Sequence, residues 1–127
     1  MFNLKNATVM EFMNEMRLRG IVGRSEVNHV KGKQVCNFSV ATDYGTVDRE
    51  GNPAIETTWF NVSAWSGREG IVELSAIQVG AWIEVIGRVR VRKYTTAENE
   101  ERSTSEILAR TVRMVPRDND RMQPQRD

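Results

Sequence analysis

The amino-acid sequence predicts an all-β domain of five strands with one short helix. Apolar residues recur at every second position in five separate segments, which is the period of strands that bury one face. Clusters of glycine, proline and charged residues separate these segments and indicate turns and loops. The chain has 127 residues, which is the size of one domain and excludes two full cores.

The first two predicted strands form a hairpin. The first, residues 15–30, carries Arg17 and Arg19 on one face, and its internal glycines indicate bends or bulges in a long, curved strand. A turn at 31–33 leads into the second strand, residues 34–42. The expected core face of this second strand comprises Cys36, Phe38 and Val40.

The third predicted strand, residues 57–65, follows a long polar loop at 43–56. Trp59 and Trp65 lie on one of its faces with small polar side chains between them. A face built only for burial more often carries aliphatic residues between two tryptophans, so this face is a candidate binding surface. The opposite, core face comprises Phe60, Val62 and Ala64.

A short helix is expected between the third and fourth strands. Ser66 and Glu69 have the spacing of a capping box, which begins a helix that should end near Ala76. The fourth strand, residues 81–92, then alternates apolar and polar positions. Its inward residues are expected to be Ile83, Val85, Val89 and Val91.

The fifth predicted strand, residues 104–115, follows a second polar loop at 93–103. Five strands with a helix between the third and fourth is the order of the OB-fold, a Greek-key barrel whose binding face lies on strands two and three. A generic antiparallel barrel or sandwich is the alternative, in which the helix is incidental. The expected core face of the last strand comprises Leu108, Val112 and Met114.

The barrel is expected to occupy residues 14–116. An N-terminal extension, residues 1–13, precedes it, and a short disordered tail, residues 117–127, follows it. No signal peptide is recognised and no stretch of about 18 apolar residues occurs, so we expect a cytoplasmic protein without a membrane span.

The formal net charge of +1 conceals a segregation of charge. Residues 15–33 hold five basic and two acidic side chains, and residues 82–93 hold four basic and one acidic. Arg88, Arg90 and Arg92 follow one another at spacing two on one strand face, where like charges repel. A polyanion crossing that face explains the pattern, and a solvated strand face is the alternative reading.

Aromatic residues are interleaved with these charges. Flat rings beside guanidinium groups suit single-stranded nucleic acid, because each ring can stack on an unpaired base, whereas duplex DNA exposes no base faces. RNA remains an alternative to DNA because stacking does not sense the 2′-hydroxyl. The candidate nucleic-acid-binding residues are Trp59, Trp65, Tyr94, Tyr44, Arg17, Arg19, Arg88, Arg90, Arg92, Lys93, Lys31 and Lys33.

No enzyme, metal site or cofactor is predicted. The single histidine, His29, lies near a hairpin turn without an adjacent nucleophile or carboxylate pair. The single cysteine, Cys36, alternates with core residues and is read as a small buried hydrophobe. No phosphate-binding glycine loop or metal-ligand spacing occurs.

Four segments resemble, in order and spacing, the bacterial single-stranded DNA-binding protein (SSB) family: NEMRLRGIVG at 14–23, VCNFSVAT at 35–42, TTWFNV at 57–62 and VGAWIEVIGRVRVRKY at 79–94. The resemblance covers about residues 14–115. It implies an OB-fold that forms homo-oligomers, tetramers more often than dimers, and wraps single-stranded DNA over stacking aromatics and a basic surface.

The resemblance also assigns individual residues and a cellular role. Trp59 matches the family's strand-three tryptophan, Trp65 falls where the family places a stacking aromatic, and Tyr94 matches the aromatic after the Arg-Lys pair. A further family aromatic aligns near Thr46, so Tyr44 replaces it only if the loop shifts. The implied role is protection of single strands during DNA replication, recombination and repair, close to the bacterial nucleoid and with replication proteins as possible partners.

Two features depart from the family pattern. Family members usually end in a long Gly/Pro/Gln-rich linker and an acidic peptide that recruits other enzymes, and the sequence ends at Asp127 without either. Recruitment by that route is therefore not expected. The apolar content of residues 1–13 is the second departure. Both favour, as the alternative, an accessory or mobile-element relative, or a protein-interaction OB module similar to primosomal replication protein N.

Overall fold

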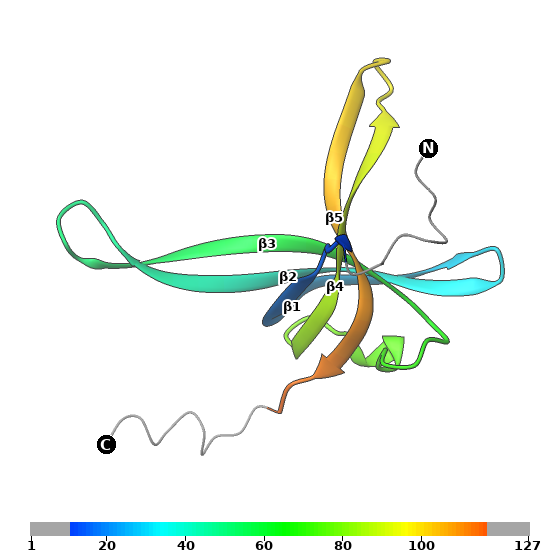
Figure 1. Cartoon of the computed structure of the whole chain (residues 1–127), viewed down its shortest axis with the longest axis horizontal. Helices are drawn as coiled ribbons and strands as arrows, with labels where there is room; N and C mark the ends of the chain where they lie inside the picture. The colour runs from blue at the N-terminus through cyan, green and yellow to red at the C-terminus, as the bar shows by residue number, and fades with distance from the viewer. Residues whose placement is uncertain (1–10, 117–127) are drawn as a thin grey trace.

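The computed structural model describes residues 11–116, which form five strands and one 3-10 turn (Figure 1). The expected tail, and the extension up to residue 10, lie outside the described residues. The strands close into a barrel in the order β1-β2-β3-β5-β4, which confirms the predicted five-stranded barrel. Only β3 and β5 pair in parallel; the other neighbours are antiparallel. The elements are β1 (Met16–Val30), β2 (Lys33–Val47), β3 (Pro53–Trp65), η2 (Leu74–Ala76), β4 (Trp82–Thr95) and β5 (Glu101–Met114).

The core lies inside the barrel and is lined by alternate residues of every strand. Apolar side chains at every second position remove one face of each strand from water, which is the main term that favours folding. The predicted core faces of β2 and β3 are confirmed, except that Phe60 is only half-buried. The most buried side chains include Phe38, Ile83, Val22, Val40, Val62, Val85, Val112 and Cys36.

The bends predicted in β1 are also confirmed. Its first half pairs with β4 and its second half with β2, and the register shifts between Val22 and Arg24, so that Gly23 is the extra residue of a bulge. A Cβ atom on Gly20 would lie 2.1 Å from the carbonyl oxygen of Ala41. Glycine therefore allows β2 to approach β1 closely where the barrel turns.

The two predicted polar loops are largely strand, which corrects the sequence interpretation. β2 and β3 continue as a paired ribbon to Val47 and Pro53, and β4 and β5 continue to Thr95 and Glu101. Figure 1 shows the two hairpins as arms that project from the barrel in different directions. The arms are exposed on both faces, so they lack the alternation of burial that reveals a strand in a sequence.

The predicted helix after β3 reduces to the single 3-10 turn η2, and no capping box forms at its start. Gly67 and Gly70 have φ angles of 81° and 95°, which a helix does not accommodate. The backbone N–H of Val72 donates instead to the carbonyl oxygen of Val112. The segment therefore packs along β5 as an extended connection.

The core faces predicted for β4 and β5 need corrections at three residues. Met114, expected in the core, is 41% exposed at the end of β5. On β5, Ala109 pairs opposite Gly87, and Arg110 is the extra residue of a bulge. The bulge shifts by one position which side chains of β5 face the core. Leu108 is therefore half-buried on the outer side, and Ile107 and Ala109 take the core positions. Val91 is 62% exposed because it lies on the projecting arm beyond the barrel.

Candidate nucleic-acid interface

Trp59 presents a fixed and accessible ring on the outer face of β3, the face directed away from the core. Its side chain is 60% exposed although the residue sits in the middle of a paired strand, opposite Ala41. The ring lies across the bulge residue Gly23, where a Cβ atom would come within 2.2 Å and 2.6 Å of two ring carbons. Because Gly23 has no side chain, the indole ring of Trp59 can pack directly against the backbone of β1. The other side of the ring is open to solvent.

Small polar side chains and two arginines continue this outer face. Asn61 follows Trp59 on the same side of β3 and lines a groove of about 220 Å³. Arg24 of β1 and Arg92 of β4 line the same groove. The groove therefore combines two guanidinium groups with the amide groups of Asn37 and Asn61.

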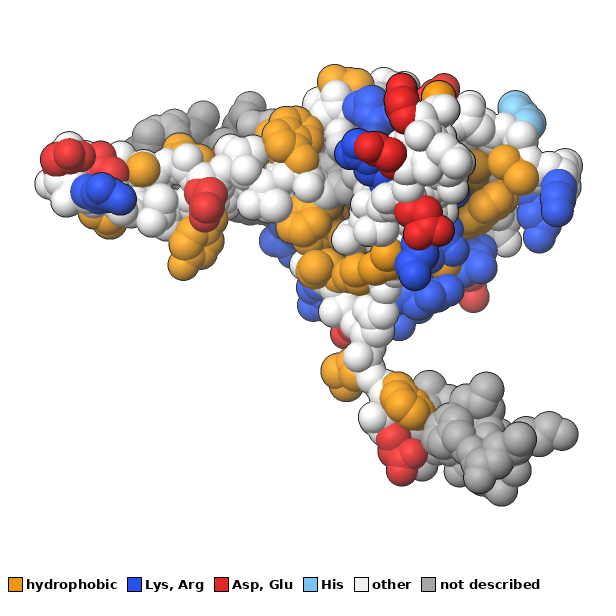
Figure 2. Space-filling model, turned by 90° about the horizontal axis from the view of Figure 1, so that it is seen from above, with side chains coloured by type: hydrophobic (Ala, Val, Ile, Leu, Met, Phe, Trp, Pro, Cys, Tyr) orange, Lys and Arg blue, Asp and Glu red, His pale blue; other side chains and the backbone are white. Residues whose placement is uncertain are grey.

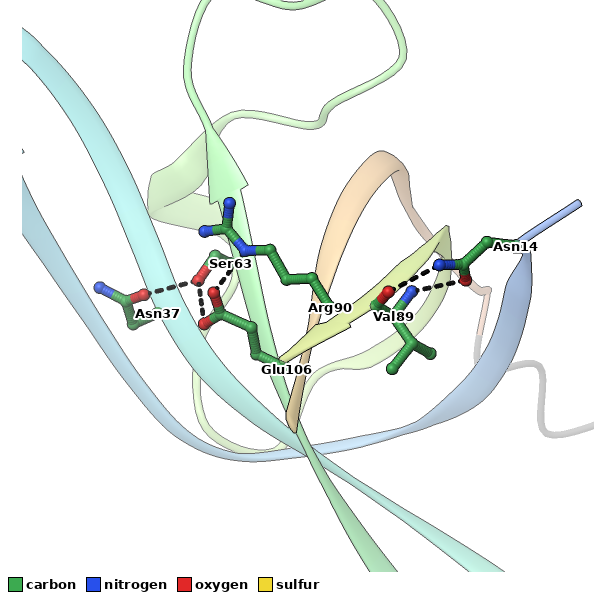
Figure 3. Close-up of polar contacts among 6 residues, drawn as sticks. All are labelled: Asn14, Asn37, Ser63, Val89, Arg90 and Glu106. Atoms are coloured by element: carbon green, nitrogen blue, oxygen red, sulfur yellow. Dashed lines mark hydrogen bonds and ion pairs between the residues drawn. The ribbon is translucent and has the colours of Figure 1, made fainter. Parts of the chain in front are cut away.

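A hydrogen-bonded network joins four residues from four strands (Figure 3), and three of them also line this groove. Arg90 Nε donates to Glu106 Oε2 at 2.6 Å, and Ser63 Oγ lies 2.9 Å from Asn37 Oδ1 and 3.4 Å from Glu106 Oε1. Glu106 is only 8% exposed, and its charge is met by Arg90. The network fixes the base of the β4–β5 arm against β2 and β3, across a junction where β3 and β5 pair at only two positions.

The arginine row predicted on β4 is present, but its members differ. Arg88, Arg90, Arg92 and Tyr94 share the outer face of β4 in the pairing with β5. Arg90 is neutralised by Glu106, so the repulsion expected among three free arginines does not arise. Tyr94 is 48% exposed, two positions beyond Arg92, whereas Lys93 lies on the other face of the arm.

Trp65 lies at the end of β3 beside a broad cleft of about 980 Å³. Lys31 and Lys33 of the β1–β2 turn line this cleft, together with Arg68 from the connection after β3. The ring of Trp65 is half-buried. An aromatic side chain and three cations therefore converge at the second position where an aromatic binding residue is predicted.

Besides Lys93, three further predicted residues are not brought to these surfaces. Tyr44 is 70% exposed, but it pairs opposite Glu56 and points to the other face of the β2–β3 arm from Trp59. Arg17 and Arg19 lie on the half of β1 that pairs with β4. The predicted residues thus divide among several surfaces of the barrel and its arms.

Arg19 belongs to an ion-pair cluster on the part of the barrel where β1 pairs with β4. Arg19 Nη2 lies 2.9 Å from Glu84 Oε2, and Arg113 Nε lies 2.7 Å from Glu84 Oε1. The hydrogen bonds from Arg113 and Arg19 hold the pKa of the Glu84 carboxyl below its usual range. Arg19 is therefore engaged within the barrel before any ligand arrives.

Sequence reasoning missed three contributors to these surfaces: Gly23, Arg24 and Arg68. Only the bulge places Arg24 on the Trp59 side of β1, and a glycine inside a strand pattern is the one signal that points to it. Figure 2 shows that Lys and Arg side chains gather over the barrel rather than along the β2–β3 arm. The distribution of charge agrees with the segregation that underlies the formal charge of +1.

The titratable side chains outside these surfaces form no metal site in the part of the chain that the structure describes. Within residues 11–116, no three His, Cys, Asp or Glu side chains come together as metal ligands. Cys36 is fully buried, as predicted, and burial raises the pKa of its thiol, so the sulfur stays neutral. No helix among these residues has the length and apolar content needed to cross a membrane.

The five-stranded barrel and its aromatic, basic outer face define an OB-fold with a surface suited to a flexible polyanion. Residues 13–115 match the model of the single-strand binding protein family, and the chain belongs to that family. This membership confirms the family resemblance noted in the four sequence segments.

Several relatives and solved structures are similar to the chain. The single-stranded DNA-binding protein of Neisseria meningitidis serogroup A is 32% identical over 107 residues, which cover 81% of this chain and 60% of that protein. Single-stranded DNA-binding protein 1 of Xylella fastidiosa strain 9a5c is 31% identical over 114 residues, covering 87% of this chain and 83% of that protein. The chain thus spans less than two thirds of the length of the Neisseria relative.

The structural matches support the fold at low sequence identity. A Plasmodium falciparum SSB solved in complex with ssDNA superposes with a TM-score of 0.66 at 19% identity, covering 83% of this chain and 96% of that one. A deletion variant of the single-stranded DNA binding protein from Thermus aquaticus gives a TM-score of 0.67 at 15% identity, covering 83% of this chain and 51% of that one. Both matches confirm the predicted OB-fold.

Proposed function

We propose that this chain binds single-stranded DNA with little sequence preference and without catalysis. The observation that carries the proposal is the Trp59 ring, exposed on the outer face of β3 and seated on Gly23, beside a groove that Arg24 and Arg92 line. The relatives from Neisseria and Xylella are single-stranded DNA-binding proteins, which supports the same ligand.

The binding mode follows from the chemistry of this surface. Bases stack on Trp59, Trp65 and Tyr94, and each stacked base contributes roughly 1–3 kcal/mol whatever its identity. Arginine and lysine side chains neutralise the phosphates between the bases, so the logarithm of affinity falls with the logarithm of salt concentration by about 0.7 per phosphate contacted. Little sequence preference results because stacking and charge neutralisation do not read base edges.

The wider role rests on family membership. We propose protection of single strands during DNA replication, recombination and repair, by a homo-oligomer for which a tetramer is favoured over a dimer. The bacterial cytoplasm, close to the nucleoid, is the expected location. Light-scattering mass tests the oligomer, and imaging of the tagged protein tests the location.

Replacement of Trp59 by alanine tests the proposal. The variant should bind labelled oligo-dT more weakly by roughly 1–3 kcal/mol, which is about a 5- to 150-fold rise in Kd. Fluorescence anisotropy of the labelled strand provides the measurement. Val79→Ala is the control, because Val79 is also exposed, at 68%, and lies in the connection before β4. Equal affinities for the Trp59→Ala variant and the unaltered chain would contradict the stacking role.

A protein-interaction module is the second candidate function. The observation that favours it is the high exposure of Phe12 and Met13, at 62% and 87%, next to the first strand. Deletion of residues 1–13 separates the two functions. If the deletion variant still binds oligo-dT and the Trp59→Ala variant does not, DNA is supported as the ligand. Loss of a protein partner on deletion, with DNA binding absent, supports the module.

A further inference from the structure

Three arginines line a small cleft beside the bulge in the β4–β5 pairing. The cleft has a volume of about 240 Å³, and the arginines are Arg68, Arg88 and Arg110. They come from the connection after β3, from β4 and from β5. Within residues 11–116, the guanidinium groups of Arg68 and Arg88 have no hydrogen-bond or ion-pair partner.

The β5 bulge directs Arg110 to this cleft. Arg110 is the extra residue between Ala109 and Thr111, and a bulge aims its side chain out of the regular alternation. Gly87 lets the two strands come close at this point, because a Cβ atom there would lie 2.3 Å from the carbonyl oxygen of Leu108. The two strands thereby hold Arg88 and Arg110 on either side of the same hollow.

Two further segments complete the walls. The backbone N–H of Val112 donates to the carbonyl oxygen of Gly70 at 2.9 Å, which ties the connection that carries Arg68 to β5. The side chain of Asn14 makes two hydrogen bonds with the backbone of Val89, at 2.7 Å and 2.9 Å (Figure 3). Four separate parts of the chain therefore hold the cleft in shape.

The charge of the cleft favours a phosphate group. Among residues 11–116, its one acidic contact is the pair between Arg110 Nη2 and Glu15 Oε2 at 3.1 Å, and both side chains are at least half-exposed. Exposed pairs of this kind contribute at most about 1 kcal/mol. A phosphate accepts hydrogen bonds from several guanidinium groups at once, which makes it a better partner for three arginines than one carboxylate is.

We propose that this cleft binds a backbone phosphate of the same DNA strand that lies over Trp65. The inference rests on the proposed function and deepens it. Arg68 lines both the Trp65 cleft and the arginine cleft, so a strand that leaves Trp65 passes Arg68 and meets Arg88 and Arg110 next. The cleft is thus a second anchoring point, which only a strand long enough to extend past Trp65 reaches.

Arg110→Gln in the full chain tests the inference, because Arg110 belongs to the arginine cleft alone among these surfaces. An oligo-dT strand of about 6 nucleotides lies within the usual site size of one OB-fold, about 4–16 nucleotides, and a strand of about 30 nucleotides exceeds it. We expect the variant to bind the long strand about three- to tenfold more weakly, as one exposed charge-assisted contact is lost. Its salt slope for that strand should fall by about 0.7, and short-strand affinity should not change.

Two further variants test the cleft, and the first of them matches the charge change of Arg110→Gln. Arg49→Gln removes one positive charge at the exposed tip of the β2–β3 arm, and Glu15→Gln frees Arg110 from its carboxylate. The inference expects no length-specific loss for the first variant and tighter long-strand binding for the second. Equal losses for Arg110→Gln and Arg49→Gln at both lengths, or no loss for Arg110→Gln, would overturn it.

A pyrophosphate titration distinguishes the two sources of phosphate. Calorimetric binding of pyrophosphate that depends on Arg110, with long-strand affinity insensitive to Arg110→Gln, would overturn the strand assignment in favour of a free phosphate compound. Failure of the unaltered chain to bind the short strand would contradict the proposed function itself. Short-strand binding with no dependence of the long strand on Arg110 would contradict the cleft alone.

Discussion

Gly23→Ala tests how the fold holds the Trp59 ring ready for a base. The added methyl carbon would lie 2.2 Å and 2.6 Å from two ring carbons of Trp59 and 3.3 Å from Ser39 Oγ. Carbon atoms in contact are about 3.5 Å apart or more, so the nearer ring carbon must move by at least about 1.3 Å. The ring is 60% exposed and can move toward solvent, which spares the barrel.

The Gly23→Ala variant is expected to lose part of the free energy that base stacking on Trp59 contributes to binding. If the displaced indole no longer presents its face beside the groove, binding of oligo-dT weakens by up to about 1–3 kcal/mol. Anisotropy of a labelled strand measures that change, and thermal unfolding followed by circular dichroism shows that the fold persists. The tryptophan emission maximum should also shift, because the ring of Trp59 moves away from Gly23 toward solvent.

Gly45→Ala is the matched control for this variant. Gly45 also lies on the outer face of the β2–β3 ribbon, opposite Ile55, but a Cβ atom there would meet nothing within 4 Å. Both substitutions restrict the unfolded chain equally. Unchanged affinity of the Gly23→Ala variant, with a folded barrel and with Trp59→Ala weakening binding, would refute the view that Gly23 positions the ring.

Two further predictions concern the barrel rather than the ligand. Because Arg19 and Arg113 lower the folded-state pKa of Glu84, its contribution to stability is present above the usual glutamate pKa and is lost as pH falls through the folded value. The free energy of unfolding, measured with urea, should therefore fall less below about pH 4 in the Glu84→Gln variant than in the unaltered chain. The same pH dependence in both proteins would contradict this role of Glu84. Gly20→Ala places a methyl carbon 2.1 Å from a backbone oxygen of β2 that cannot rotate away. It should lower the urea midpoint by an amount that corresponds to about 1–3 kcal/mol, and stability equal to that of Gly45→Ala would show that the strands can separate there.

The core strands and the main aromatic position could be predicted because burial on one face leaves a period of two in the sequence. Cys36, Phe38 and Val40 are core residues as expected, and the exposed side of β3 carries Trp59 as expected. The same principle explains the failure on the two arms. Residues such as Tyr44 lie on ribbons that face water on both sides, so no alternation of burial marks them.

Bulges and strand register account for the other differences between the predicted and the observed positions of side chains. One extra residue, Arg110, reverses the parity of β5 and moves Leu108 out of the core position predicted for it. The same register sets Arg90 opposite Glu106, which turns an expected free cation into an ion pair. A sequence read one strand at a time cannot reveal such pairs, because they depend on which residues two distant strands place side by side.

The central claim is that an exposed aromatic and basic face binds unpaired bases and phosphates. Titration of the full chain with oligo-dT and with duplex DNA, followed by tryptophan fluorescence at two salt concentrations, tests it most directly. The account predicts saturable quenching by oligo-dT that weakens with salt by about 0.7 per phosphate on logarithmic scales, and little quenching by duplex DNA. Unchanged fluorescence at saturating oligo-dT in low salt, with no mobility shift, or equal quenching by the duplex, would contradict it.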